Sequence, residues 1–194
     1  MEWLLEADYS ILLFLNGLHS PFFDWLMMLL TAPEPWIPLY FAIASFIVYY
    51  YGYKKGDYKY SFALIAGAIL TFALTDMGSS AIKDYFERLR PGHDPRLEGL
   101  VRLLDGKGGM YGFISSHASN VFGLATITSL AFRKRWYSAT ILIWAAGVSY
   151  SRIYVGRHFP SDVVAGAIFG FFAGLICYKL VSHFFLKSKI KCTT

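Results

Sequence analysis

Three short segments of this chain contain residue types that can hold and break a phosphate ester. Together they supply three cations, two histidines, one carboxylate and two serines: Lys83, Arg90, Arg152, His117, His158, Asp162, Ser115 and Ser116. Cations neutralise the charge on a phosphoryl group, and an imidazole can transfer a proton or attack as a nucleophile. These residues can act together only if the fold brings the three segments to one place.

The first segment joins a cation at the end of an apolar stretch to a second cation in an Arg-Pro pair. Lys83 ends a predicted helix, Arg90 follows seven residues later, and Pro91 ends the helical pattern. If the helix continues to Arg90, both cations lie on one face, two turns apart, and could hold a phosphate. The alternative is a pair of cations that extend from a helix end to the membrane boundary.

The second segment precedes another apolar stretch and combines two serines with a histidine. Free backbone N–H groups and the positive end of the helix dipole favour an anion at a helix N-terminus. Ser115 and Ser116 could therefore lie beside a phosphate, and His117 could donate a proton at the mouth of the site. The alternative is that one serine serves only as an ordinary N-cap.

The third segment places a histidine four residues before an aspartate. Arg152 ends an apolar stretch, and His158 and Asp162 follow around a turn that contains Gly156 and Pro160. A carboxylate at this spacing can accept a hydrogen bond from one imidazole nitrogen and leave the other nitrogen free to attack. A helix cap beside a surface histidine would explain Asp162 alone, but not its pairing with His158 and Arg152.

The composition predicts an all-α, polytopic membrane protein. The 194-residue chain is 56% hydrophobic and only 16% charged, and its mean hydropathy is +0.43. The net charge of +5 could suggest a nucleic-acid partner, but the cations gather at the ends of apolar stretches, as in membrane proteins, so no nucleic-acid partner is expected. Five stretches are predicted to cross the bilayer: Trp36–Tyr53, Tyr60–Lys83, His117–Phe132, Trp136–Ile153 and about Asp162–Phe185.

We expect one membrane-embedded domain over residues 1–194. Residues 1–33 are predicted to form two short helices at the membrane interface, with a single broken span as the alternative. Residues 36–186 form the transmembrane core, and residues 187–194 form a basic cytoplasmic tail. Two cysteines, Cys177 and Cys192, have neither metal-ligand nor disulfide spacing.

The distribution of lysine and arginine predicts the orientation in the membrane. With five spans, one face carries ten cations and a single acid, Asp57, whereas the other carries eight cations mixed with six acids. The first face is therefore predicted to be cytoplasmic. This puts the N-terminus outside and the C-terminus inside, and it brings all three polar segments to the outer face.

The three segments together resemble the motifs of the type 2 phosphatidic acid phosphatase superfamily of integral membrane lipid phosphatases. The resemblance covers residues 83–162 in the motifs and about residues 36–185 in the helix pattern. Where that family commonly has Pro-Ser-Gly-His, this chain has Ile114-Ser115-Ser116-His117, so a glycine is replaced by Ser116. The replacement puts the detailed backbone geometry at this point in doubt, but not the chemistry.

The resemblance implies a role for each residue. His158 would attack phosphorus and form a phosphohistidine, Asp162 would orient His158, and His117 would protonate the leaving oxygen and later activate water. The phosphate would be held by three cations and two neighbouring serines: Lys83, Arg90, Arg152, Ser115 and Ser116. Members of the family need no metal, so no metal or other cofactor is expected.

Three further residues are candidate substrate contacts. Asp76 lies inside a predicted span, about 10 Å deeper than Lys83 on a similar face, and intramembrane acids are often functional. A hydrogen bond to a neighbouring helix is the alternative for Asp76. Arg96 and Arg102 lie in the glycine-containing connection Gly92–Phe113, which we expect to cover the site and help to bind an anionic headgroup; a solvated connector is the alternative.

The expected function is hydrolysis of a lipid phosphate at the outer face of a bacterial inner membrane. The lipid substrate and the surrounding membrane lipids are the expected partners. Undecaprenyl diphosphate and lipid A are favoured as substrates, and phosphatidylglycerol phosphate is a further candidate. Two rivals are a vanadate-dependent haloperoxidase, a soluble class that five spans disfavour, and a non-catalytic lipid-phosphate binding or transport protein, which would more often have broken mid-membrane helices.

Overall fold

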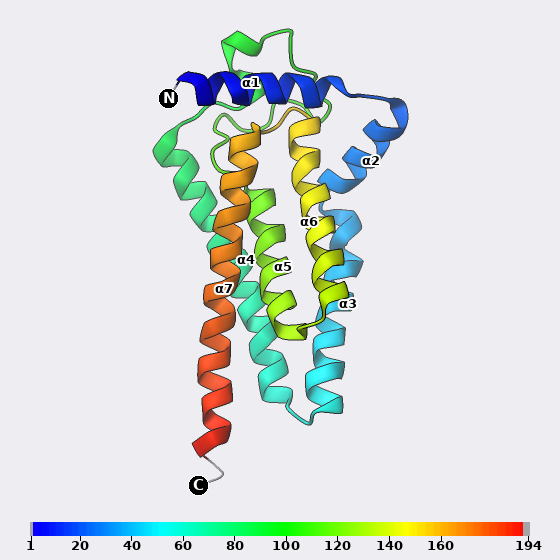
Figure 1. Ribbon diagram of the computed structural model, residues 1–194, viewed down its shortest axis with the longest axis vertical. Helices are drawn as coiled ribbons and strands as arrows, with labels where there is room; N and C mark the ends of the chain where they lie inside the picture. The colour runs from blue at the N-terminus through cyan, green and yellow to red at the C-terminus, as the bar shows by residue number, and fades with distance from the viewer. Residues whose placement is uncertain (1, 192–194) are drawn as a thin grey trace.

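The computed structural model describes residues 2–191 and is all-helical over that range, apart from loops and one isolated bridge between Leu89 and Tyr111. Figure 1 shows the long helices side by side, with the two chain ends at opposite ends of the bundle. The seven α-helices are α1 (Glu2–Gly17), α2 (Pro21–Thr31), α3 (Ile37–Ile47), α4 (Tyr58–Phe86), α5 (Ser116–Phe132), α6 (Arg135–Tyr154) and α7 (Pro160–Lys191). The predicted all-α fold class is confirmed.

The predicted spans coincide with helices, but the count of five spans stays a prediction. α4 and α7 are long and apolar enough to cross a membrane. The first predicted span consists of the short helix η1 (Glu34–Trp36), then α3, then the π-helical segment η2 (Val48–Lys54). α5, with 17 residues, and α6, with 20, occupy the remaining positions of the bundle.

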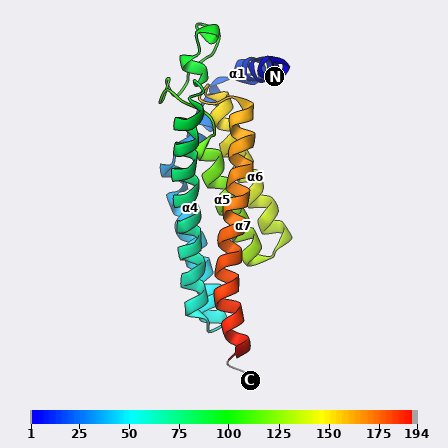
Figure 2. The ribbon, with the colours of Figure 1, turned by 90° about the vertical axis from the view of Figure 1, so that its left-hand side faces the viewer.

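The N-terminal residues form two short helices, as predicted, at one end of the bundle. α1 lies across the ends of the long helices, and Figure 2 shows it end-on at the top of the molecule. α2 begins at Pro21, with the Ser20 hydroxyl accepting a hydrogen bond from the Phe23 N–H as an N-cap. The segments Leu5–Gly17 and Pro21–Thr31 meet at 117° and together have the length and composition of a broken span, so both sequence interpretations stay open.

Helices α5 and α7 pack backbone against backbone along a stripe of glycines. Gly166, Gly170 and Gly174 recur every four residues on α7 and face carbonyl oxygens of α5, where an added Cβ would overlap those oxygens. Small residues at this spacing allow membrane helices to approach closely. The close approach brings the first turns of the two helices together, and the Ser115 N–H donates to the Asp162 carbonyl at 3.0 Å.

The connection from α4 to α5 folds over the same end of the bundle as α1. It contains two short turns, η3 (Pro91–His93) and η4 (Pro95–Leu97). The Asn16 amide of α1 donates to the backbone carbonyls of Arg102, at 2.9 Å, and Tyr154, at 2.7 Å. Arg102 also forms an ion pair with Asp24 of α2. The N-terminal helices thus fasten this connection to the bundle.

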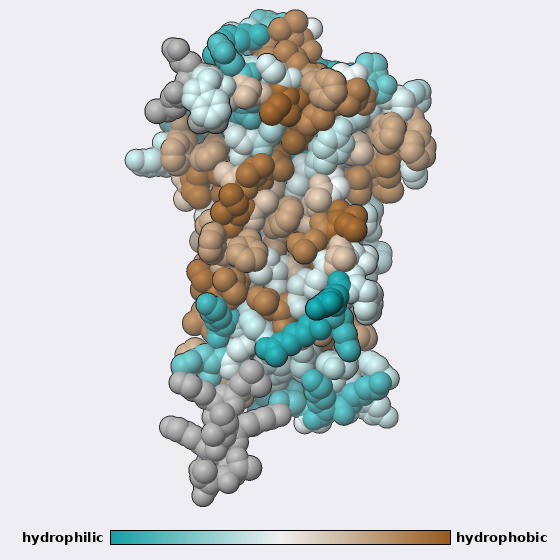
Figure 3. All heavy atoms as spheres, viewed as in Figure 1, coloured by the Kyte–Doolittle hydropathy of each residue, from teal (hydrophilic) through white to brown (hydrophobic). Residues whose placement is uncertain are grey.

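The surface has the distribution expected for a chain embedded in a bilayer. In Figure 3 hydrophobic side chains cover the middle of the molecule, and hydrophilic side chains gather toward both ends. Several large apolar side chains of α4 and α7 are exposed, including Phe62, Ile69 and Ile168. Hydrocarbon, unlike water, solvates such side chains without penalty, because there is no hydrophobic cost in lipid.

Candidate active site

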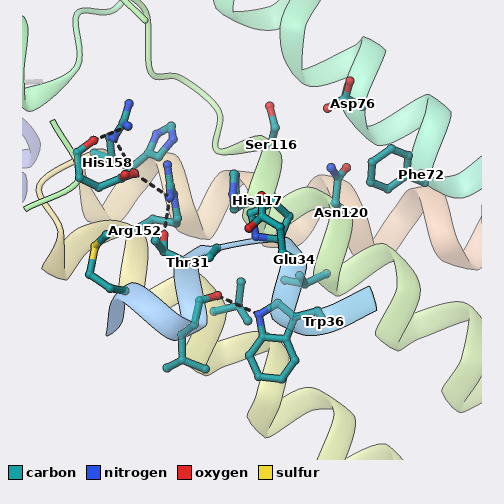
Figure 4. Close-up of a pocket in the computed structure, with 18 of the residues that line it drawn as sticks. Thr31, Glu34, Trp36, Phe72, Asp76, Ser116, His117, Asn120, Arg152 and His158 are labelled. Carbon is teal, nitrogen blue, oxygen red and sulfur yellow. Dashed lines mark hydrogen bonds and ion pairs between the residues drawn. The ribbon is translucent and has the colours of Figure 1, made fainter. Parts of the chain in front are cut away.

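The three polar segments meet at the end of the bundle that α1 covers. Lys83 lies in the last turn of α4, His117 in the first turn of α5, and His158 in the connection between α6 and α7. His117, His158 and Arg152 line a cavity of about 700 Å³ together with Ser116, Arg90 and residues of α2, η1 and α4 (Figure 4). Residues of all three segments, from Arg90 to His158, therefore share one cavity.

His158 lines this cavity and faces Asp162, which does not line it. Nδ1 of His158 lies 3.4 Å from Oδ2 of Asp162, slightly longer than a normal hydrogen bond. Both side chains are almost completely buried. Burial lowers the pKa of the His158 imidazole well below its usual range, and the positive charges of Arg152 and Arg90 lower it further. His158 is therefore neutral at neutral pH, as a nucleophilic imidazole must be.

The Asp162 carboxylate has two further partners that hold it in place. Oδ1 accepts from Arg88 at 2.8 Å, and Oδ2 accepts from the backbone N–H of Phe159 at 3.0 Å. Arg88 continues to Asp8 of α1 at 2.6 Å, and Asp8 also accepts from the backbone N–H of Ser161 at 2.9 Å. The N-terminal helix is thus connected to the pair of His158 and Asp162 through one arginine.

Sequence analysis did not identify Arg88 and Asp8 as site residues. Arg88 lies only two residues before Arg90, inside the first polar segment, so proximity to that segment was an available signal. Asp8 carried no such signal, because it is separated from Arg88 by 80 residues and from Ser161 by 153. The Asp8 residue is only 6% exposed, and this burial can be seen only in the structure.

Replacing Arg88 by glutamine is expected to lower kcat about 10- to 100-fold, with little change in KM. Losses in that range are typical of metal enzymes when a residue that hydrogen-bonds and orients a metal-binding side chain is removed, and Arg88 orients Asp162 in a comparable way. The loss should arise because the buried Asp162 loses the cation that donates to its Oδ1 and helps it to orient His158. Steady-state phosphate release by wild type and variant measures the effect, and Arg88→Lys should restore part of the rate.

Arg96→Gln is the matched control for Arg88→Gln. Arg96 lies in the same connection and also contacts α1, through Tyr9, but it pairs with Asp94 rather than Asp162. An equal loss of activity in both variants would show that anchoring of the connection matters, and that Arg88 does not act through Asp162.

The three predicted phosphate-binding cations come from different elements: Arg90 and Arg152 line the cavity, and Lys83 contacts Ser116, which also lines it. Lys83 donates to the Ser116 hydroxyl at 2.5 Å, and Nε of Arg90 donates to the Tyr111 carbonyl at 2.9 Å. Arg152 donates to the Thr31 hydroxyl of α2. α4 ends at Phe86, and Glu87 adopts a left-handed conformation, so the continuous helix that would put Lys83 and Arg90 on one face does not form. Arg90 reaches the cavity from the loop instead.

An acid of the covering connection also lies among these cations. Asp105 forms an ion pair with Arg157 at 2.9 Å and lies 3.6 Å from Arg152. Asp105 and Arg157 both line the cavity. A bound phosphate would compete with the Asp105 carboxylate for the two guanidinium groups, because each group has a limited number of donors.

The two serines of the second segment have different positions. Ser115 is fully buried and is the N-cap of α5, with its hydroxyl accepting from the Ala118 N–H at 3.4 Å. Ser116 lines the cavity and contacts Lys83. Ser116 is not among the described residues with positive φ, so its backbone does not need glycine. The replacement of the family's glycine by Ser116 therefore does not strain the backbone at this position.

The three candidate substrate contacts separate into two groups. Asp76 lines the cavity, on the α4 wall away from His158 (Figure 4). Arg96 and Arg102 do not line it; they form ion pairs with Asp94 and Asp24 respectively. The headgroup contact predicted for these two arginines stays a prediction, and their contacts in the structure are with neighbours of the connection and the N-terminal helices.

Comparison with known proteins agrees with this arrangement. Residues 58–185 match the model of the PAP2 superfamily. A lipid A 4′-phosphatase of Bacteroides thetaiotaomicron is 39% identical over 94% of this chain and 80% of its own length, and one of Porphyromonas gingivalis is 36% identical over 93% and 75%. The crystal structure of Aquifex aeolicus LpxE superposes with a TM-score of 0.65 at 24% identity, covering 88% of this chain and 94% of that one.

A second solved structure shares the fold. It is a PAP2-type phosphatidylglycerolphosphate phosphatase from Bacillus subtilis, with a TM-score of 0.67 at 23% identity over 96% of this chain and 88% of that one. The chain belongs to the PAP2 superfamily. It is a phosphatase, and the family resemblance seen in the three motifs is confirmed.

Proposed function

We propose that this protein is a multi-pass membrane phosphatase that removes a phosphate monoester from lipid A. The observation that carries the proposal is the cavity in which His158, held by Asp162, faces His117 and the cations Arg90 and Arg152. Relatives over 35% identical that cover almost the whole chain are lipid A 4′-phosphatases, which supports lipid A over the other lipid phosphates. Undecaprenyl diphosphate and phosphatidylglycerol phosphate are the alternative candidate substrates.

The proposed reaction has two steps. Nδ1 of His158 faces Asp162, so Nε2 attacks phosphorus while the bond from phosphorus to the sugar oxygen breaks. His117 gives its proton to the departing oxygen, which leaves as a hydroxyl group. Water then attacks the phosphohistidine, His117 takes a proton from that water, and inorganic phosphate and neutral His158 are formed.

The cations of the cavity supply the electrostatic stabilisation of both steps. Lys83, Arg90 and Arg152 reach the site from three different elements, so they can contact different equatorial oxygens of the phosphoryl group. Phosphoryl transfer depends mainly on positioning and on charge stabilisation, which fixed cations provide. We therefore propose a reaction that requires no metal ion.

The site is proposed to face the outside of the inner membrane, with the C-terminus in the cytoplasm. The cation-rich end of the bundle, around Lys54 and Arg133, lies opposite the end that holds His158. Positive charge concentrates on the cytoplasmic side of membrane proteins, which supports this orientation.

Phosphate release by the detergent-purified protein tests the proposed function. Lipid A, undecaprenyl diphosphate, phosphatidylglycerol phosphate and phosphatidic acid are supplied separately, with EDTA present. We expect the highest kcat/KM with lipid A, and no loss of activity on adding EDTA. A higher kcat/KM with another lipid would replace lipid A as the substrate, and no release from any of them would contradict a phosphatase.

A further inference from the structure

Part of the cavity beyond the phosphate-binding residues carries polar groups that the proposed reaction does not use. Asp76 of α4 and Asn120 of α5 both line the cavity. Figure 4 shows His158 and Arg152 toward one end of it, and Asp76 and Asn120 toward the other, beside Phe72. We call Asp76 and Asn120 the polar wall.

The polar wall lies at a defined distance from the phosphate-binding end. The bond from Lys83 to Ser116, 2.5 Å long, fixes these two residues at one level of α4 and α5. Asp76 precedes Lys83 by seven residues, about 10 Å along α4, and Asn120 follows Ser116 by four residues, about 6 Å along α5. A substrate whose phosphate lies among the cations would pass the polar wall one to two sugar rings away.

The groups of the polar wall are positioned to bind a ligand rather than each other. The Thr75 hydroxyl lies 2.6 Å from Oδ1 of Asn120, which fixes the amide and leaves its two N–H donors to other partners. The Asp76 side chain is exposed, and among residues 2–191 the structure shows no hydrogen bond or ion pair to it. Lys83 attracts this carboxylate electrostatically but does not donate a hydrogen bond to it, so its oxygens are available to donors of a ligand.

An apolar cavity continues from the polar wall into the bundle. It has a volume of about 350 Å³ and shares four lining residues with the first cavity: Tyr40, Phe72, Asn120 and Val121. Its other lining residues are apolar side chains of α3, α4 and α5, including Ile43, Ile47 and Ile65. Along the two adjoining cavities, the lining therefore changes from cations to hydrogen-bonding groups and then to apolar side chains.

We infer that the polar wall binds the hydroxyl and amide groups of a phosphorylated sugar whose acyl chain occupies the apolar cavity. An acylated sugar phosphate presents phosphate, polar donors and hydrocarbon in this order. A prenyl diphosphate places hydrocarbon next to its phosphates, where Asp76 would be left without donors. The pairing of an acceptor, Asp76, with a donor, Asn120, fits neutral hydroxyl and amide groups. The inference rests on the proposed function and makes Asp76 and Asn120 determinants of its specificity.

Removing the carboxylate of the polar wall should separate glycolipid hydrolysis from simple phosphate-ester hydrolysis. Asp76→Leu is compared with wild type on lipid A, on farnesyl phosphate and on p-nitrophenyl phosphate, which lacks both sugar and lipid chain. We expect kcat/KM for lipid A to fall about 10- to 100-fold, as for loss of a hydrogen bond to a charged group. The rates with p-nitrophenyl phosphate should stay nearly unchanged, because this substrate has no sugar or acyl chain to reach Asp76.

Asp84→Leu is the matched control, because Asp84 is an exposed acid of the same helix, next to Lys83, that does not line the cavity. Asp76→Asn keeps the size of the side chain and should give an intermediate loss if Asp76→Leu folds poorly. An equal loss on all three substrates, or none on lipid A, would overturn the inference. A wild-type enzyme inactive on lipid A but active on farnesyl phosphate would instead reject the proposed substrate, which the wild-type rates alone reveal.

Discussion

His158→Gln is expected to lower phosphate release from the lipid substrate by at least about 10⁴-fold, as for removal of the central residue of a nucleophilic site. Glutamine preserves much of the side-chain volume in a pocket where His158 is only 2% exposed, but its amide cannot form the covalent intermediate. The same substitution should abolish the acid-labile phosphoprotein that wild type forms with ³²P-labelled substrate. Rapid quenching followed by gel autoradiography measures that intermediate directly.

The control for this prediction is His183→Gln. His183 lies near the C-terminal end of α7, whereas His158 precedes the start of that helix, so the two histidines are far apart along it. It should leave both phosphate release and phosphoprotein formation unchanged. Retention of a labelled intermediate in His158→Gln would place the covalent step on another residue, and retention of more than a tenth of the wild-type rate would remove His158 as the nucleophile.

The positions of the helices could be predicted from the sequence because their signals are local. Apolar stretches of sufficient length predicted α4 and α7, and the pair Ser115 and Ser116 marked the start of α5 without showing which of them is its N-cap. The convergence of the three polar segments at one end also followed, since consecutive antiparallel helices alternate their ends. The lengths of the helices and their order along the chain were sufficient to predict both features.

The parts of the site that sequence analysis missed depend on contacts across long separations. Asp8 reaches Arg88 only because α1 lies across the end of the bundle, an orientation that no local pattern specifies. The sequence left open whether α4 continues to Arg90; the left-handed Glu87 ends that helix, and contacts of the loop then position Arg90. Ser116 rather than Ser115 lines the cavity, because which serine becomes the N-cap depends on the packing of α5 against α7.

The spacing of glycines on α7 was available in the sequence and accounts for that packing. The segment GAIFGFFAG repeats glycine every fourth residue, which is typical of close membrane-helix pairs. Because the glycines let α7 approach α5, the Ser115 N–H can reach the Asp162 carbonyl. The geometry of the active site therefore depends on a contact between two helix backbones that extends well below it.

Gly170→Ala is expected to destabilise the protein by about 3 kcal/mol, at the upper end of the range for inserting a methyl group into a tightly packed interior. A Cβ at this position would overlap the Ser119 carbonyl oxygen and lie 2.9 Å from the Gly123 nitrogen, and neither backbone atom can move without shifting α5. Activity should fall along with stability, because separating α5 from α7 pulls Ser115 away from Asp162. Unfolding in mixed detergent micelles, followed by circular dichroism, measures the loss.

Gly147→Ala provides the comparison that isolates the glycine contact from the general effect of adding a methyl group to a helix. Gly147 lies in α6, where an added Cβ would meet only the side chain of Leu30, at 3.8 Å, an ordinary contact distance. Alanine there should leave stability unchanged or raise it by about 0.5–1 kcal/mol, because alanine is the better helix former. Equal stability losses in the two variants would show that the approach of α7 to α5 does not limit this fold. A loss confined to Gly170→Ala would show that it does, and that the site near Asp162 is held by the packing beneath it.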